Sequence, residues 1–198
     1  ADLDLKPFFN LKTGNYTVFW KILTEEQYHK RNLLNEQRAE NLKKLEPVTV
    51  DRVTVGDETS EQKHDLKGNS TFGKGNMGIL NDVPWRFAEP DGFSYKLNIP
   101  SDEPVSVYFR FMGRIQNETW DCKIKADTTT IIHLKRAMDD SYPVIPYEYV
   151  FKVPYDLTRG KNGIRVGFEV KNTKQMPRLM EIRILRKQNY LMYPAMTI

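Results

Sequence analysis

Apolar and polar residues alternate almost one by one in three stretches between residues 93 and 126, and this pattern constrains the fold more than any other feature. In residues 93–99 every odd position is Phe, Tyr, Leu or Ile, and every even position is polar. Residues 105–111 and 120–126 follow the same rule closely. Successive side chains of a strand point to opposite faces, so each stretch predicts a strand with one apolar face.

Further short apolar stretches extend this pattern to both sides, and turn-forming residues separate them. Strands this short, each with one apolar face, are buried by pairing two sheets over a shared core. The sequence therefore predicts a mainly β fold, an antiparallel β-sandwich of the jelly-roll, galactose-binding-like type with about eight strands. No helical pattern is found after residue 47. The additional predicted strands are residues 48–55, 129–134, 147–154, 163–170 and 179–185.

The first 46 residues have a different character. Residues 15–23 form an apolar, β-branched and aromatic run that predicts a strand. Residues 25–46 contain neither Gly nor Pro, and Thr24 with Gln27 forms a capping-box pattern that predicts a helix start. Pro47 ends this helix.

Two domains are predicted from this change: an appendage of strand plus helix over residues 1–46, and the sandwich over residues 47–198. The apolar stripe of the helix is thin, so we expect the helix to lie on a surface. Its predicted inner residues are Tyr28, Leu34, Leu42 and Leu45.

Charge gives little support to a nucleic-acid partner. The net charge is +4, but basic and acidic residues are mixed along the chain rather than gathered in one arm. The densest basic stretch, residues 178–187, places Arg183 between two isoleucines, which predicts the solvent-facing side of a strand. No apolar run approaches the roughly 20 residues of a membrane helix, so no membrane span is expected.

Cysteine and histidine usage argues against metal and cofactor chemistry. Cys122 is the single cysteine, which excludes an internal disulfide and a zinc site of the CxxC type, and its position in a strand predicts burial. The three histidines have no second histidine at ligand spacing, so no metal and no cofactor are predicted. His29 is expected to face solvent, and His133 is expected to face solvent or a partner surface.

Residues 67–82 contain four glycines and little periodicity, which predicts a surface loop of the kind that carries function on a sandwich. Trp85 and Arg86 follow it, with Asp82 and Asp91 nearby; this composition suits a saccharide site. Alternatively, Trp85 closes one end of the sandwich and Arg86 pairs with an acid. Arg86 is predicted to be the more exposed of the two.

His64 is the other candidate for chemistry, because Glu61 precedes it by three residues and Asp65 is adjacent. A carboxylate beside an imidazole can perform acid–base work. The same pair can instead tie a loop to a sheet by hydrogen bonds, and no nucleophile motif accompanies it. No catalytic residue is assigned on this basis.

Five segments occur in order along nearly the whole chain: "LKPFFNLKTGNYTVFWKILT", "VDRVTVGDETSEQKHDL", "WRFAEPDGFSYKL", "VYFRFMG" and "FKVPYDLTRGKNGIRVGFEV". Together they resemble the C-terminal region of the bacterial β-L-arabinofuranosidases, glycoside hydrolase family 127, and their gut-bacterial relatives. The resemblance implies β-sandwich domains that follow an α/α-barrel with catalytic glutamates and a zinc-bound cysteine cluster. One cysteine cannot supply that cluster, so no catalytic residue carries over.

The predicted function is that of a non-catalytic accessory module of an arabinofuranosidase-like protein. Such a module packs on a catalytic domain of the same polypeptide and binds an oligo- or polysaccharide. Two alternatives stay open: a small hydrolase or lyase that uses the His64 region, and a purely structural domain. The resemblance implies a periplasmic or extracellular location, with the cytoplasm left open. The predicted ligand-binding residues are Trp85, Arg86, Asp82, Asp91, His64 and Glu61.

Overall fold

The computed structural model describes residues 24–68, 76–80, 83–88, 92–112, 119–136, 147–170 and 176–186. The chain forms two compact units, residues 1–42 and 43–198, and each is considered by itself. The strand predicted at residues 15–23 lies outside the described residues, and the domain boundary at residue 46 stays a prediction.

Helix α1 (Glu25–Leu45) begins at the predicted capping box. The Gln27 amide donates to Thr24 Oγ1 at 3.2 Å, and the Thr24 amide donates to Gln27 Oε1 at 3.1 Å. Two glutamates in the first turn and two lysines in the last complement the helix dipole. The prediction of Tyr28 as an inner residue is wrong, since it is 47% exposed, whereas Leu45 is buried. Leu42 is half-buried, and the structure does not describe the side chain of Leu34.

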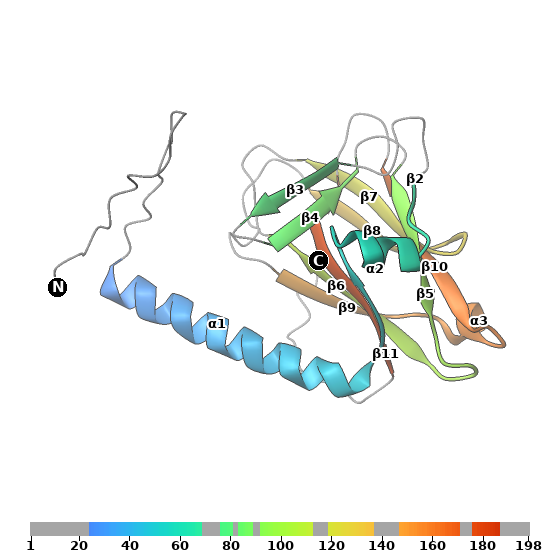
Figure 1. The fold of residues 1–198 in the computed structure, drawn as a ribbon, viewed down its shortest axis with the longest axis horizontal. Coiled ribbons are helices and arrows are strands. Elements are labelled where there is room, and N and C mark those ends of the chain that lie inside the picture. Colours follow the sequence, from blue (N-terminus) through green and yellow to red (C-terminus); the bar gives the residue numbers. More distant parts are fainter. Residues whose placement is uncertain are drawn as a thin grey trace. The chain divides into compact units, whose positions relative to one another are not determined.

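Residues 43–198 contain two antiparallel sheets stacked face to face (Figure 1), which confirms the predicted mainly β sandwich. The six-stranded sheet contains β1 (Thr49–Thr54), β3 (Asn76–Leu80), β4 (Val83–Phe87), β6 (Val105–Phe111), β9 (Tyr147–Lys152) and β11 (Leu179–Arg186). The five-stranded sheet contains β2 (Lys67–Gly68), β5 (Phe93–Asn98), β7 (Trp120–Ala126), β8 (Thr129–Arg136) and β10 (Gly163–Val170).

Strand β11 lies in the middle of the six-stranded sheet and pairs with three other strands. Strand β6 pairs along one side of it. The other side is shared: β4 pairs at Leu179, and β1 pairs from Glu181 to Leu185. In the five-stranded sheet the order is β2-β5-β10-β7-β8. Strands β1 and β4 therefore pair with different parts of β11, and helix α2 (Glu58–Lys63) follows β1 in the chain.

The core lies between the sheets and is filled by the residues that the alternation predicts. Phe109 of the six-stranded sheet meets Phe168 of the five-stranded sheet with ring centroids 5.9 Å apart. Phe168 also contacts Phe93 at 5.1 Å, and all three rings are fully buried. Cys122 is buried in the same cluster, as predicted.

The prediction of no helix after residue 47 is wrong. A 3₁₀ turn covers Glu46–Val48, α2 covers Glu58–Lys63, and α3 covers Tyr155–Thr158. Each is too short, at three to six residues, to show a helical repeat of apolar positions. The predicted loop at residues 67–82 is also partly wrong, since it contains β2 and β3, and β3 pairs with β4 as a hairpin.

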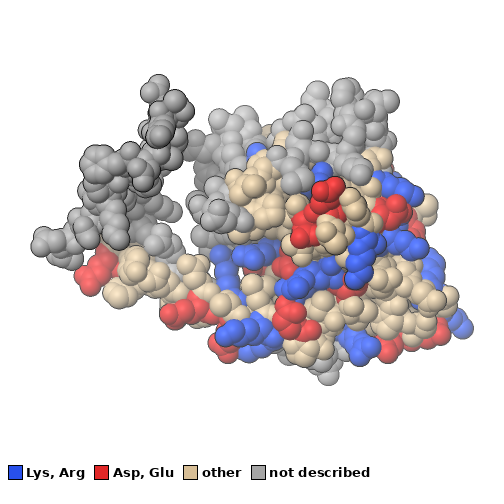
Figure 2. Space-filling view, in the orientation of Figure 1, with Lys and Arg blue, Asp and Glu red and all other residues tan. Residues whose placement is uncertain are grey.

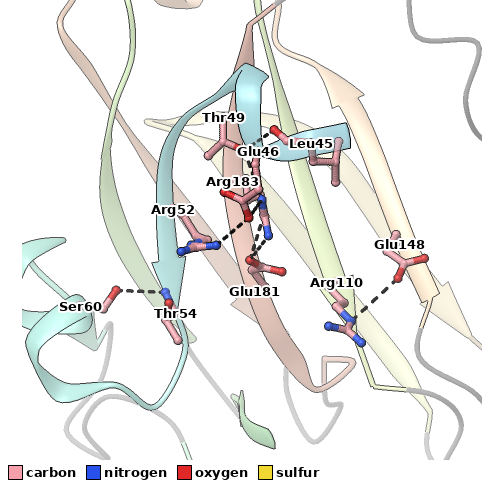
Figure 3. A network of polar contacts seen from close by, with 10 residues as sticks. All are labelled: Leu45, Glu46, Thr49, Arg52, Thr54, Ser60, Arg110, Glu148, Glu181 and Arg183. Carbon is pink, nitrogen blue, oxygen red and sulfur yellow. Dashed lines mark hydrogen bonds and ion pairs between the residues drawn. The ribbon is translucent and has the colours of Figure 1, made fainter. Parts of the chain in front are cut away.

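Arg183 corrects another expectation, that it lies on the solvent-facing side of its strand. Its side chain points away from the core but is only 4% exposed, because Glu46 and the strands beside β11 enclose it (Figure 3). Its guanidinium donates to Glu46 Oε1 at 2.9 Å and to Glu181 Oε1 at 2.9 Å. The hydrogen bond from Arg183 is the main cause that lowers the pKa of Glu46. An outward-facing residue on a central strand is thus buried by the chain segment that crosses it.

Basic and acidic side chains are interspersed over the described part of the face shown in Figure 2. None of the described helices is long and apolar enough to cross a bilayer.

Candidate functional site

Helix α2 begins at a local hydrogen bond and is tied at once to β1. Asp57 is its N-cap, and Asp57 Oδ1 accepts from the amide of Ser60 at 2.6 Å. Ser60 Oγ accepts from the amide of Thr54, the last residue of β1, at 3.0 Å (Figure 3). The six residues of α2, Glu-Thr-Ser-Glu-Gln-Lys, are all polar, so polar contacts must hold this helix in place.

Glu61 of α2 joins the two sheets. Arg86 of β4 donates to it from two nitrogens, Nε to Oε1 at 3.0 Å and Nη2 to Oε2 at 2.6 Å. The hydroxyl of Tyr95, on β5 of the other sheet, donates to Glu61 Oε1 at 2.7 Å. All three residues are buried, with Arg86 only 5% exposed. Bidentate Arg–carboxylate pairs are among the stronger hydrogen-bonded contacts in proteins.

The pKa values of Glu61 and Tyr95 are set by their burial and by the groups that pair with them. Burial alone would raise the pKa of Glu61, but hydrogen bonds from Arg86, Tyr95 and the amide of Gly56 outweigh it and lower that pKa. Burial and the neighbouring Glu61 carboxylate raise the pKa of Tyr95. Glu61 is thus a carboxylate and Tyr95 a neutral phenol at neutral pH.

His64 makes the second connection from α2. Its Nδ1 lies 2.5 Å from the carbonyl oxygen of Ser60, and its Nε2 lies 3.1 Å from Oδ1 of Asp51 on β1. The other carboxylate oxygen of Asp51 accepts from the amide of Asn98 on β5 at 2.7 Å. The carbonyl of His64 accepts from the amide of Lys96 at 2.7 Å. We call Asp51, Glu61, His64, Arg86 and Tyr95 the α2 clasp.

We expect the clasp to make the stability of the fold depend on pH in the acidic range. Burial favours protonation of Asp51, yet hydrogen bonds from Asn98 and His64 prevail and lower its pKa below the ordinary 3.8, as the pKa of Glu61 is lowered below 4.5. A lowered folded-state pKa stabilises the fold above the unfolded-state value and loses that contribution as pH falls through the folded-state value. We expect the urea midpoint to fall progressively below about pH 4.5.

Asp51→Asn provides the comparison for this pH dependence. It removes one of the two titrating carboxylates, so the variant should be less stable than the wild type at pH 7 but lose less stability between about pH 5 and pH 3. Urea unfolding followed by tryptophan fluorescence measures both. Parallel acid profiles for the two proteins would show that Asp51 does not carry the effect.

A pocket of about 410 Å³ lies beside the clasp. This volume is within the roughly 300–1,000 Å³ of typical small-molecule sites. Glu58, Gln62 and Asp65 contribute exposed side chains to it. Its lining thus combines carboxylates, an amide and a guanidinium, which hydrogen-bond well to hydroxyl groups. The lining residues are Glu58, Glu61, Gln62, Asp65, Leu66 and Arg86.

Trp85 lies on β4 but faces the other way from Arg86. It is half-buried, and its ring packs against Gly78 of the paired strand β3, where a Cβ atom would lie 2.1 Å from the ring. The guanidinium of Arg178 lies 4.7 Å from the centroid of the same ring. A sugar could stack on this face of Trp85 only by displacing Arg178.

The structure brings together three of the six predicted site residues and separates a fourth. Glu61, His64 and Arg86 meet at α2, while Trp85 lies on the opposite face of β4. Asp82 and Asp91 lie outside the described residues. The prediction of an exposed Arg86 is wrong, because Glu61 and Tyr95 enclose it; the alternative, in which Arg86 pairs with an acid, is confirmed.

Sequence reasoning missed Asp51 and Tyr95 as members of the cluster. Asp51 had a detectable signal: it shares the parity of the buried Val53 and Val55, so it is a charged residue at an inward position. Such a residue requires a partner. Tyr95 was predicted to be inward, but its sequence position does not show which acid its hydroxyl reaches.

The clasp is arranged for cohesion rather than proton transfer. Both ring nitrogens of His64 contact protein atoms, and both oxygens of Glu61 accept hydrogen bonds from the protein.

Other groups that could do chemistry are also unsuited to it. Burial, with the nearby charges of Asp121 and Glu169, raises the pKa of the Cys122 thiol, which disfavours the reactive thiolate. Among the described residues, no group of three or more His, Cys, Asp or Glu side chains is placed to hold a metal ion.

Comparison with known proteins places the chain in a family. A family model described as "Family of unknown function (DUF6805)" matches residues 44–185, and the chain belongs to this family. No curated protein matches the chain.

Solved structures show only distant likeness. One is a family 35 carbohydrate-binding module from Clostridium thermocellum, at 8% identity over 55% of this chain and 85% of that one, with a TM-score of 0.40. Another is the CBM36-1 domain of a xylanase from the hindgut metagenome of Trinervitermes trinervoides, at 14% identity, 60% and 94% coverage and a TM-score of 0.39. An exo-β-1,3-galactanase from Phanerochaete chrysosporium matches at 9% identity, covering 63% of this chain and 28% of that one, with a TM-score of 0.42. At these scores the likenesses carry no conclusion about ligand or activity.

Proposed function

We propose that this chain is a non-catalytic β-sandwich module that binds glycan through the pocket beside α2. The observation that carries the proposal is the pocket's lining: Glu58, Gln62 and Asp65 present exposed hydrogen-bonding groups above a floor fixed by the clasp. Rigidly held polar groups recognise hydroxyls at little entropic cost. The carboxylate of Asp65 is itself held by Lys67 and Arg165, whose hydrogen bonds lower its pKa, with Lys67 the larger cause.

The His64 hydrolase is the less favoured alternative. A general base needs a nitrogen within hydrogen-bond reach of the substrate proton. Both His64 nitrogens already contact protein atoms, and the side chain is only 3% exposed. A substrate would have to break the clasp to reach the imidazole.

The resemblance of the sequence to the C-terminal region of β-L-arabinofuranosidases supports the wider setting of the proposal. In that setting the module is part of a carbohydrate-active bacterial protein, packs on its catalytic domain and works in the periplasm or outside the cell. Arabinan is therefore the first neutral glycan to test.

The test is a binding panel on the intact chain. Affinity gel electrophoresis and calorimetric titration with arabinan, arabinoxylan, galactan and polygalacturonate should detect binding to at least one polymer, with no release of reducing sugar. Glu58→Ala combined with Gln62→Ala removes two exposed lining groups. The double variant should bind roughly tenfold more weakly, which is the loss expected from about one charge-assisted hydrogen bond. Arg86→Ala is unsuitable here, because it also breaks the clasp.

Glu36→Ala with Gln37→Ala is the matched control, since both residues are exposed on α1. It should leave binding unchanged. Absence of binding to every polymer would refute the proposal in favour of a purely structural domain. Release of sugar that disappears in His64→Ala would favour the hydrolase.

A further inference from the structure

Four strands of the five-stranded sheet carry a net positive charge on their outer face. Five basic and two acidic side chains point outward from β5, β7, β8 and β10, a difference of 5 − 2 = +3, against +4 for the whole chain. The basic residues are Lys96, Lys123, Lys125, Lys135 and Arg165, and the acidic residues are Asp121 and Glu169. His133 lies on the same face.

Three of the lysines on this face are not neutralised. Glu169 pairs with Lys125, and Asp121 pairs with His133 at 2.6 Å. Lys96, Lys123 and Lys135 form no ion pair with any described residue. Alternate residues of a strand lie about 7 Å apart on one face, so the unpaired Lys123 lies next to the ion pair of Lys125 and Glu169.

Gly167 makes a hollow in the middle of this face. Its strand neighbours in register are Ser94 and Lys125. A hollow of about 260 Å³ lies over it, with Arg165 on one side and Glu169 on the other; Asp127, which pairs with Lys161, also lines it. A Cβ atom at Gly167 would meet only Ser94 Cβ at 3.6 Å, which is ordinary contact, so the backbone does not require glycine here.

This hollow adjoins the pocket beside α2. Asp65 lines the pocket, Arg165 lines the hollow, and the two side chains form an ion pair. Arg165 also donates to Ser94 Oγ at 3.2 Å. A polymer seated beside α2 can therefore continue across the outer face of the sheet.

We propose that this face binds an acidic polysaccharide, one whose sugar rings carry carboxylates, with a ring over Gly167 and its carboxylate on Lys123. The proposal rests on the proposed function and specifies its ligand class. Neutral sugars are commonly held by stacking on exposed aromatic rings, yet no aromatic side chain of the described residues projects from this face. Lysine and arginine instead supply charge-assisted hydrogen bonds to carboxylates.

The two acids favour a sugar acid over nucleic acid. Duplex DNA carries a charge about every 1.7 Å, so Glu169 and Asp121 among the lysines would repel it. A polyuronide has only one carboxylate per ring, and its hydroxyls can donate to Glu169 and Asp121 between the charged contacts.

The experiment titrates the intact chain with polygalacturonate and with its fully methyl-esterified form, which keeps the backbone but lacks the charge. Polygalacturonate should bind, more weakly at high salt, and the ester should bind at least roughly tenfold more weakly. Lys123→Gln should lower affinity roughly tenfold, and Gly167→Leu should do the same by filling the hollow. Lys152→Gln, which removes an exposed lysine from β9 of the other sheet, should have no effect.

Each other outcome overturns the inference in a distinguishable way. Binding of neutral polymers alone, unaffected by Lys123→Gln, would leave the proposed function standing and remove the acidic ligand. Binding of no glycan would remove both. Equal binding of duplex DNA with the same sensitivity to Lys123→Gln would replace the sugar acid with a general polyanion. Circular dichroism confirms that Gly167→Leu is folded before its affinity is interpreted.

Discussion

Arg86→Ala is expected to lower the free energy of unfolding by about 3–5 kcal/mol, the usual cost of removing one partner from a buried ion pair. The variant leaves the Glu61 carboxylate buried without its paired cation, and the remaining hydrogen bonds from Tyr95 and the amide of Gly56 do not supply a compensating positive charge. For a chain of this size the melting temperature should fall on the order of 10 °C. Urea unfolding and calorimetry measure the two quantities.

Arg52→Ala is the matched control for this loss. Arg52 also pairs with a glutamate, Glu46 at 3.0 Å, but both side chains are about half exposed. Exposed pairs contribute about 0–1 kcal/mol, so Arg52→Ala should be nearly neutral. Equal, small effects from both variants would mean that the clasp does not stabilise the fold.

Phe109→Ala is expected to cost about 3–5 kcal/mol, because it opens a cavity where the two sheets meet. Its ring contacts Phe168 across the interface, and Phe111 and Phe151 within the six-stranded sheet. Neighbours of a fully buried ring in a packed core can relax only in part. Denaturant unfolding of the variant gives the loss directly.

Tyr155→Ala removes an aromatic ring of similar size from α3, where it is 39% exposed. It should cost no more than about 1 kcal/mol. A Phe109→Ala variant as stable as Tyr155→Ala would contradict a shared core between the sheets.

Most of the sandwich could be predicted because its strands alternate strictly. The strands that contain Phe93, Phe109 and Cys122 were located to within a residue, and their inward side chains were identified. Period-2 alternation is a local property of sequence, and burial on one face enforces it.

The features that were missed depend on contacts distant in sequence. Helix α2 has no apolar face, since polar bonds to residues such as Arg86, 25 positions away from Glu61, hold it in place. Arg183 alternates like a solvent-facing residue, but Glu46, 137 positions away, helps to cover it. In both cases the chain segment that buries the residue cannot be inferred from the pattern around it.

The candidate site was predicted in part for the same reason. Asp51 and Arg86 both occupy inward parity, beside Val53 and Ala88, and a charged residue at such a position signals a buried partner. Parity alone cannot pair Asp51 with His64 or Arg86 with Glu61.

Native-state hydrogen exchange of the amides at the end of α2 tests most directly whether α2 is part of the sandwich. The amides of His64 and Leu66 donate to the carbonyls of Ser60 and Glu61, and the amide of Lys96 donates to the carbonyl of His64. If the clasp joins the sheets, the amides of His64 and Leu66 should exchange only with opening of the sandwich, at rates close to those of Lys96 and the other amides of β5 and β10. Rapid exchange at His64 and Leu66 while β5 stays protected would contradict the clasp and return Glu61 and His64 to consideration as groups free to do chemistry.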